Sequence, residues 1–488
     1  MLSINGQPSS MALGRSLFIF FNHALWRAAH ALFQLPAENA YLLFKYAVIM
    51  ECPLAVIACW TLARDLTRSL QAAAIAALLV ATSPAYVIYS GQVMTEIPSL
   101  LLTALALILH LRGLRTGRVW MMLMGAALLG LGVNVREPVA FYAPWLLIAP
   151  FVCGPKTEQQ RNIFFLIVAP CLVFLVCAFG PFILWFWTNA YGFRESWYGW
   201  RESMLMESSR HPVRAANVLP FLLYFFLAAP HVFLSLPFAF LKEWRERRIF
   251  SCLLMMGALG LWANVLLIFN YSTVVNWRYF LTGLPALAPL AGAWLLGWRR
   301  EKLSHDTRRA FMQIVVTLML STVGLGIYAQ VMSREFAEMR RLTRDYSARL
   351  ALVPSDAVLI AGGQTVTVTY YRGIGMGRWE VIGTGGGWPG PALVPTIERY
   401  LQQGRRVFLD RDARWWSVCG WPLEETRAIS TLESHFRFRR VSETIFEIRP
   451  MNDVTANDQP DLQSLLPENR PVDTKKCTRA RRWIRDEK

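Results

Sequence analysis

The chain has 488 residues, of which 54% are hydrophobic and only 17% are charged. Soluble globular proteins carry about 25% charged residues, so this composition excludes an ordinary soluble protein and predicts a chain that lies mostly in a bilayer. The formal net charge of +17 lies mainly in short loops between apolar segments and in the final tail, a distribution that membrane topology explains better than nucleic-acid binding.

The first 36 residues precede the apolar windows and do not form a signal peptide, because polar residues interrupt the run from Leu17 to Phe21. They fit an amphipathic helix in the headgroup layer. Its lipid-buried residues are Leu17, Phe18, Phe21, Leu25 and Phe33, and its polar residues are His23, Arg27 and His30.

Apolar windows that can cross the hydrocarbon core follow, about ten in all. They cover residues 39–62, 70–88, 98–112, 120–134, 138–153, 163–187, 218–241, 249–270, 281–298 and 310–332. Alternate loops are rich in Lys and Arg, and the positive-inside bias makes these loops cytoplasmic. The basic residues are Arg64, Arg68, Arg112, Arg115, Arg118, Lys156, Arg161, Lys242, Arg245, Arg247, Arg248, Arg299, Arg300, Lys302, Arg308 and Arg309. Segments 86–97, 135–138, 188–217 and 271–280 then face outward.

An even number of crossings places both chain ends on the outer side, which is an awkward start for a membrane protein. We therefore expect that a spanning helix precedes this chain, and the alternative is one miscounted short span.

Residues 333–450 have the composition of a small water-soluble domain. Its predicted strands are 357–361, 365–371 and 406–410, its helix is 391–403, and 436–449 is a closing hairpin or edge strand. Residues 451–488 form a basic, disordered tail. The predicted fold class is an all-α polytopic membrane domain over residues 37–332, followed by a small α/β domain on the outer face.

The cysteines do not indicate a disulfide set, a redox site or a zinc site. Five of the eight lie inside apolar stretches, and no Cys-x-x-Cys motif occurs. These five are Cys52, Cys59, Cys171, Cys177 and Cys252.

Three outward segments carry ionisable residues at the ends of spans, where an idle charge costs several kcal/mol, so these residues are candidates for function. Glu96 lies just before Pro98, and its alternative role is to cap the following helix. Arg136 and Glu137 occupy a tight turn, where the guanidinium group of Arg136 is a candidate to bind a phosphate through paired donors. The alternatives are that Arg136 extends to the lipid headgroups or forms an ion pair with Glu137.

Arg278 and Tyr279 lie on a third outward loop, where Arg278 stabilises a phosphate leaving group or merely anchors the chain at the interface. In the long loop 188–217, Trp197, Tyr198 and Arg201 are candidates to contact a sugar or a polyprenyl chain, and an interfacial aromatic girdle is the alternative. His211 has no second histidine at ligand spacing and is a weak metal candidate.

The ordered motifs resemble those of the GT-C membrane glycosyltransferases, and more narrowly the bacterial branch akin to protein mannosyltransferases and aminoarabinose transferases. They are Ser83-Pro84, the run 89–98 with Glu96, Gly130-Leu131-Gly132 with Arg136 and Pro138, and Arg278-Tyr279 with Leu284-Pro285. The likeness covers about residues 10–330.

The resemblance implies transfer of a hexose or pentose from a polyprenyl-phosphate donor to a lipid, glycan or protein acceptor on the outer face of the bacterial inner membrane. In some members a divalent metal takes part, for which Glu96 and His211 are the candidates here. In this family the main carboxylate base usually lies in the first outer loop, and residues 1–36 would then be the remnant of that loop. The chain has no acid before Glu38, so we expect a truncated start, with Glu96 at the family's second acidic position and an inactive chain as written.

The alternative function is a non-enzymatic carrier or transporter of a lipid-linked substrate. Transporters generally place polar residues at mid-membrane, often in paired halves. Here the polar residues gather at one face and the halves do not correspond, which favours the enzyme. A carrier requires a central pathway, whereas the enzyme requires a cavity that converges on Glu96, Arg136 and Arg278.

Overall fold

The structure is a computed structural model. It describes residues 15–35, 40–154, 162–188, 217–246, 251–265, 277–300, 344–361, 377–383, 390–410 and 431–452, with the single residues 197, 368 and 372. The chain divides into two compact units, one within Gln7–Met332 and one within Ser333–Lys488.

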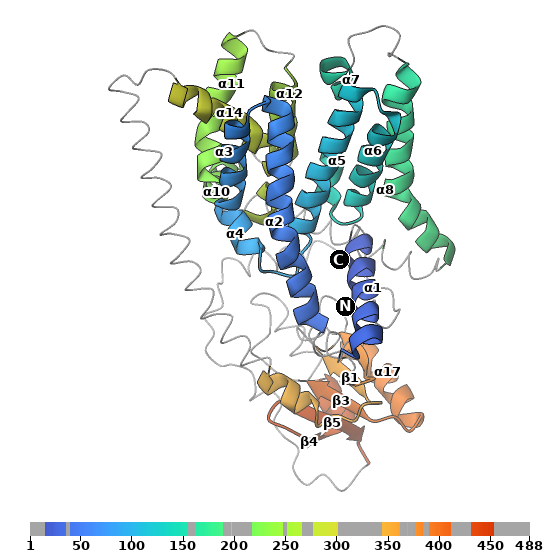
Figure 1. Cartoon of the computed structure of the whole chain (residues 1–488). Coiled ribbons are helices and arrows are strands. Elements are labelled where there is room, and N and C mark those ends of the chain that lie inside the picture. Colours follow the sequence, from blue (N-terminus) through green and yellow to red (C-terminus); the bar gives the residue numbers. More distant parts are fainter. Residues whose placement is uncertain are drawn as a thin grey trace. The chain divides into compact units, whose positions relative to one another are not determined.

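The first unit is a bundle of helices (Figure 1). Its α-helices are α1 (Ser16–Phe33), α2 (Ala40–Thr67), α3 (Leu70–Ala81), α4 (Pro84–Tyr89), α5 (Glu96–Thr116), α6 (Val119–Val133), α7 (Pro144–Cys153), α8 (Ala169–Thr188), α10 (Val218–Ala228), α11 (Pro230–Arg245), α12 (Cys252–Val265) and α14 (Leu284–Arg300). Two short 3₁₀ helices, η3 (Glu137–Tyr142) and η8 (Trp277–Thr282), lie between α-helices, and the π-helical turn η5 (Phe164–Val168) leads into α8.

Within the described residues, three helical segments are long and apolar enough to cross a membrane: Leu43–Thr67, Glu96–Thr116 and Phe164–Thr188. Helices α10 and α11 meet the same criteria together, although they bend by 112° between them, and five further apolar helical segments are shorter. The second unit adds a small sheet with a helix. The predicted fold class, a helical polytopic membrane unit followed by a small α/β unit, is confirmed. The predicted span 310–332 lies outside the described residues.

Proline positions shorten two of the predicted spans. The window 70–88 is divided into α3 and α4, because Pro84 starts a new helix after Ser83. The window 138–153 begins with η3 and continues as α7, which starts at Pro144. The first window is therefore not one continuous helix, whereas the second remains a single short apolar helical segment, Glu137–Cys153.

Glycines allow close packing between the helices. A Cβ atom on Gly125 of α6 would lie 2.7 Å from the carbonyl oxygen of Ala106 in α5, and one on Gly292 of α14 would lie 2.7 Å from that of Ala72 in α3. Small residues at such contacts are typical of packed membrane helices, because apolar side chains gain little by leaving lipid for one another.

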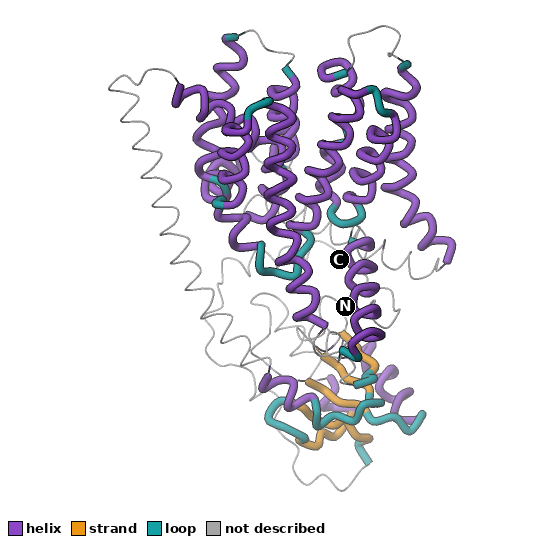
Figure 2. The backbone as a smooth tube through the Cα atoms, viewed as in Figure 1, coloured by secondary structure: helices purple, strands orange, loops and turns teal. Residues whose placement is uncertain are grey.

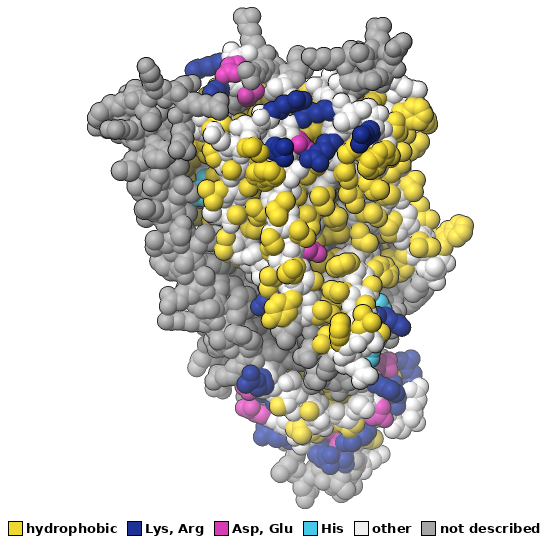
Figure 3. Space-filling model, viewed as in Figure 1, with side chains coloured by type: hydrophobic (Ala, Val, Ile, Leu, Met, Phe, Trp, Pro, Cys, Tyr) yellow, Lys and Arg dark blue, Asp and Glu magenta, His cyan; other side chains and the backbone are white. Residues whose placement is uncertain are grey.

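The outer surface of the bundle is rich in large apolar side chains (Figure 3). Phe151, Val176, Trp187 and Leu219 are all strongly exposed. An apolar surface of this extent is unfavourable in water and is accommodated by lipid. Helix α1 also exposes Phe21 and Phe33, but its predicted location in the headgroup layer stays a prediction.

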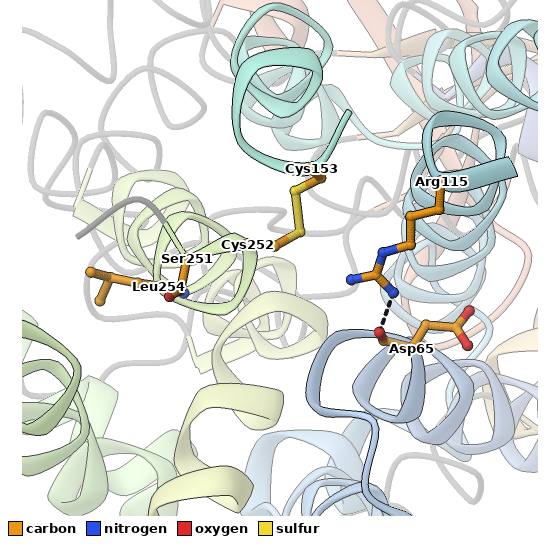
Figure 4. Close-up of a disulfide and its surroundings, with 6 residues drawn as sticks. All are labelled: Asp65, Arg115, Cys153, Ser251, Cys252 and Leu254. Carbon is orange, nitrogen blue, oxygen red and sulfur yellow. Dashed lines mark hydrogen bonds between the residues drawn. A yellow bond between two sulfur atoms is a disulfide. The ribbon is translucent and has the colours of Figure 1, made fainter. Parts of the chain in front are cut away.

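Cys153 and Cys252 form a disulfide that links the end of α7 to the start of α12, with their Cα atoms 5.7 Å apart (Figure 4). The sequence-based dismissal of a disulfide was therefore wrong for Cys252. An apolar window gives no information on which helix ends the fold brings together.

The second unit contains a five-stranded mixed sheet with the order β2-β1-β3-β5-β4. The strands are β1 (Val358–Ala361), β2 (Glu380–Gly383), β3 (Val407–Asp410), β4 (Phe436–Arg440) and β5 (Ile445–Pro450), and α17 spans Gly390–Gln402. Strand β1 is parallel to β2 and β3, whereas β5 is antiparallel to β3 and β4. Figure 2 shows the strands and helices of the chain in separate colours.

The predicted strands 357–361 and 406–410, the helix and the hairpin agree with the structure. Strand β2 was missed, and the predicted strand 365–371 lies outside the described residues apart from Val368, which is helical. Leu393 and Ile397 of α17 belong to one buried core with Val407 and Leu409 of β3 and Phe446 and Ile448 of β5.

One buried carboxylate holds several arginines in the second unit. The Glu447 side chain on β5 is 6% exposed, and its oxygens lie 2.7 Å from Arg406 Nε, 3.0 Å from Arg439 Nε and 3.1 Å from Arg449 Nη2. Burial alone would raise the pKa of Glu447, but hydrogen bonds from Arg406 and Arg449 oppose it, and the net result is a pKa below the ordinary 4.5.

We expect Glu447→Gln to lower the free energy of unfolding of this unit by roughly 2 kcal/mol at pH 7, because it removes charge-assisted hydrogen bonds. When the pKa of a carboxyl is lower in the folded than in the unfolded state, its ionised form stabilises the fold. This stabilisation is complete at a pH above the unfolded-state pKa and is lost as the pH falls through the folded-state pKa. The difference from wild type should therefore shrink below pH 4.5. Denaturant-dependent proteolysis of the full chain measures the difference in the free energy of unfolding between the variant and the wild type. The exposed Glu398→Gln is the control, and equal losses in both variants would contradict the role of Glu447.

Candidate active site

Three chain segments meet at one end of the helical unit. Glu96 is in the first turn of α5, together with Pro98. A proline is tolerated in the first turn of a helix. Arg136 has an extended backbone, with φ −160° and ψ 126°, and directly precedes η3. Arg278 and Tyr279 belong to η8, which precedes α14.

These segments bring a carboxylate and two guanidinium groups together. Arg136 Nη2 lies 3.4 Å and Arg278 Nε lies 3.7 Å from the same oxygen, Oε1 of Glu96. The side chains of Glu96 and Arg136 are 4% and 3% exposed, and that of Arg278 is 23% exposed. Charges this deeply buried persist only when paired, so the cluster of Glu96, Arg136 and Arg278 holds the three segments together.

Tyr279 forms an aromatic surface beside both guanidinium groups. The Cζ atoms of Arg136 and Arg278 lie 4.7 Å and 5.1 Å from the centre of its ring, within the range of a cation–π interaction. Arg136 Nη1 also donates a hydrogen bond of 3.4 Å to the carbonyl oxygen of Arg278. Both arginines are thus oriented by contacts other than Glu96.

The cluster leaves polar atoms without hydrogen bonds. Within the part of the chain that the structure describes, Glu96 Oε2 and Arg278 Nε are buried and have no hydrogen-bond partner. Both ion pairs are also longer than a tight charge-assisted hydrogen bond. Unsatisfied buried groups of this kind call for a partner, and here one acceptor and one cationic donor remain available to a bound molecule.

Two residues that the sequence analysis did not select fix the geometry around the cluster. The Tyr142 hydroxyl donates a 2.6 Å hydrogen bond to the carbonyl oxygen of Thr282 and so joins η3 to η8. Asn134 Nδ2 donates to the carbonyl oxygens of Cys177 and Ala178, each at 3.1 Å, and ties the end of α6 to α8. An amide inside an apolar window was an available signal for Asn134, whereas no sequence signal marks Tyr142.

The other predicted site residues have varied positions. Glu137 starts η3 and lies within electrostatic reach of Arg136 and Glu96. The side chain of Trp197 is exposed, and its predicted contact with a sugar or a polyprenyl chain stays a prediction. Tyr198, Arg201 and His211 lie outside the described residues.

The described surroundings of Glu96 supply few ligands for a divalent cation, and His211, the other metal candidate, lies outside the described residues. The described residues contain no group of three or more His, Cys, Asp or Glu side chains able to hold a metal ion. Two guanidinium groups next to Glu96 would also repel such an ion.

Comparisons with known proteins agree with the predicted resemblance. Residues 24–185 match the family model of dolichyl-phosphate-mannose-protein mannosyltransferases. No curated protein matches the chain in sequence.

Among solved structures, the chain is similar to ArnT from Cupriavidus metallidurans bound to undecaprenyl phosphate. The TM-score is 0.55 at 13% identity, covering 90% of this chain and 92% of that chain. The apo state of the same protein gives a TM-score of 0.50 at 16% identity, covering 90% and 87%. The resemblance to the GT-C membrane glycosyltransferases is thereby confirmed, with these two structures supporting the fold.

Tyr142→Phe should lower the free energy of unfolding by about 1 kcal/mol, because the buried carbonyl of Thr282 loses its hydrogen bond. Unfolding of the purified protein in increasing dodecyl sulfate measures this loss. Tyr46→Phe, at an exposed tyrosine of α2, is the matched control. A Tyr142 variant as stable as this control would show that the link between η3 and η8 contributes nothing.

Proposed function

We propose that this GT-C-fold membrane protein transfers a sugar from a polyprenyl-phosphate donor to an acceptor at the outer face of the membrane. The proposal depends chiefly on one observation, the buried cluster in which Arg136 and Arg278 approach a single oxygen of Glu96. The undecaprenyl phosphate bound to the similar ArnT supports a donor of this class.

The two arginines are suited to the phosphate of such a donor. When the bond between the sugar and the phosphate breaks, negative charge develops on the polyprenyl phosphate. Guanidinium groups that are already positioned and largely shielded from water stabilise such charge strongly. Arg278 is the more exposed of the two, and its Nε makes no hydrogen bond although it lies near Glu96 Oε1, so we assign it the first contact with the phosphate and assign Arg136 a supporting charge.

Glu96 is suited to holding a hydroxyl or amino group. Its Oε1 faces both guanidinium groups, while Oε2 is buried without a partner and can accept a hydrogen bond from the acceptor or the donor sugar. Because Oε1 of Glu96 is already engaged by two guanidinium groups, we assign removal of the acceptor's proton to a second base, a role that the resemblance gives to an acid of the first outer loop.

The outer-face location rests on the distribution of loop charges. The cluster belongs to segments poor in uncompensated basic residues, whereas the other ends of α2, α5 and α11 carry several arginines and lysines. The transferred sugar is a hexose or a pentose, as in the enzymes that the chain resembles.

Binding of undecaprenyl phosphate tests the site without knowledge of the sugar. Arg278→Ala and Arg136→Ala should each weaken binding about 10- to 100-fold, which corresponds to the loss of a charge-assisted hydrogen bond. Titration of the lipid into purified protein, followed by native mass spectrometry, gives the affinities. Arg27→Ala, at an exposed position of α1, should bind like the wild type.

Sugar transfer tests the reaction itself. We expect Glu96→Ala and Arg278→Ala to abolish transfer of radiolabelled sugar from undecaprenyl-phosphate-linked hexoses or pentoses in a system where the wild-type protein is active. Transfer that persists in both variants would reject the site. Uptake of the labelled lipid into sealed vesicles without a glycosidic product would instead favour a carrier.

The Cys153–Cys252 disulfide tests the orientation. Chain order places it at the opposite end from the cluster, because α7 follows η3 and ends at Cys153. In the proposed orientation this pair faces the reducing cytoplasm, where disulfides are rare. The disulfide that the structure contains would then be opened by cytoplasmic reductants, so we expect both thiols to be reduced in intact cells and to accept a mass-tagged maleimide after acid quenching. A fully oxidised pair in cells would contradict the orientation and leave the site unaffected.

A further inference from the structure

A second group of charged residues surrounds a cavity where α2 ends, α3 begins and α5 ends. The cavity has a volume of about 370 Å³ and is lined by Arg64, Asp65, Arg68, Leu70 and Arg115. Three guanidinium groups and one carboxylate therefore line this cavity. We call it the basic cavity.

The one carboxylate of the basic cavity is already paired. Arg112 of α5 donates to both oxygens of Asp65, from Nε at 2.5 Å and from Nη2 at 3.4 Å. Arg115 Nη1 donates to the backbone carbonyl oxygen of Asp65 and not to its carboxylate (Figure 4). Asp65 thus neutralises Arg112, and the charges of Arg64, Arg68 and Arg115 have no other carboxylate within ion-pair distance in the described chain.

The backbone and the packing hold these arginines in place. Arg68 has a φ of 54°, a left-handed conformation that favours glycine, and its N–H donates to the carbonyl oxygen of Arg64 to close α2. The guanidinium of Arg64 lies 5.5 Å from the ring centre of Trp60. Arg115 is fixed by Asp65. Arg64 and Arg68 are exposed, but these contacts restrict where their guanidinium groups can lie at the mouth of the cavity.

The basic cavity lies at the opposite membrane surface from the Glu96 cluster. Glu96 and Arg115 are 19 residues apart on α5, and a rise of about 1.5 Å per residue separates them by about 28 Å. This is close to the roughly 30 Å thickness of the hydrocarbon core. A ligand of the basic cavity is thus at headgroup level in the other leaflet.

The flank of the cavity points to a lipid and not to a free phosphate. Leu70, which lines it, is 61% exposed, and Ile57 and Leu54 of α2 are similarly exposed nearer the membrane centre. Acyl chains can cover these residues while the phosphate meets the guanidinium groups. Figure 3 shows basic side chains gathered beyond the apolar band at this end of the bundle. A neighbouring cavity shares Arg68 but contains Glu243 and Glu246, which suit an anion less well.

We propose that the basic cavity binds the phosphate of an anionic phospholipid in the leaflet opposite the sugar-transfer site. Basic pockets between membrane helices recognise such headgroups, and paired guanidinium donors match phosphate oxygens. The positive-inside bias accounts for basic residues on this side, but it does not require them to line a cavity whose carboxylate is already neutralised.

Thermal unfolding of the full chain in neutral detergent tests the proposal. Phosphatidylglycerol should raise the unfolding temperature of the wild type by about 3–5 °C, whereas phosphatidylcholine and inorganic phosphate at equal phosphate concentration should leave it unchanged. The double variant R64Q/R68Q should lose at least half of the shift. Arg118→Gln, a basic residue at the same end of α5 and α6 but outside the cavity, should keep it.

Each contrary result has a distinct meaning. An equal shift with inorganic phosphate overturns the lipid as the ligand, and an equal shift with phosphatidylcholine overturns the need for an anion. Loss of the shift in Arg118→Gln, or its full retention in R64Q/R68Q, overturns the cavity. If the double variant is unstable without lipid, the single change Arg64→Gln, at an exposed side chain, decides by the amount of phosphatidylglycerol that copurifies.

Discussion

The pairing of Glu96 with Arg136 and Arg278 is the interaction on which the arrangement of the first unit depends. In a medium of low dielectric constant, none of these charges is tolerated alone. Their meeting therefore fixes the start of α5, the turn before η3 and the turn of η8 relative to one another. The resulting pairs are long, and both Glu96 Oε2 and Arg278 Nε lack hydrogen bonds in the described chain. A site meant only for stability would be expected to satisfy these atoms.

The local sequence explains why these charges lie on short turns and not in the middle of helices. Pro98 and Pro138 lie at the starts of helical segments, and a proline is tolerated there because the first N–H groups have no partner within the helix. Glu96 and Arg136 consequently sit where the backbone changes direction. The hydrogen bond from Tyr142 to Thr282 then holds η3 against η8, so the two arginines do not depend on Glu96 alone for their separation.

The sequence predicted the helical membrane unit, most of the strands and the three charged residues, because each has a local cause. Long apolar windows indicate spans, and an isolated charge on a short turn between two spans indicates a functional or capping residue. Tyr142, the Cys153–Cys252 pair and strand β2 were missed. Each depends on a partner far along the chain: Tyr142 on Thr282, Cys153 on Cys252, and Glu380 of β2 on Val358 of β1. Local patterns carry no information on such partners, and the short β2 also gave too few residues for a clear alternation.

Helix α5 connects the two polar ends of the unit. Its first turn presents Glu96 to Arg136 and Arg278, and its last turns present Arg112 and Arg115 to Asp65 of α2. Rotation of α5 about its own axis would move both sets of side chains at once, since they belong to one continuous helix. The Asp65 contacts therefore limit the rotation of α5 and help to keep the Glu96 carboxylate directed at the guanidinium groups. The close packing of Gly125 against α5 also limits the rotation of this helix, because side chains that moved with it would collide with α6.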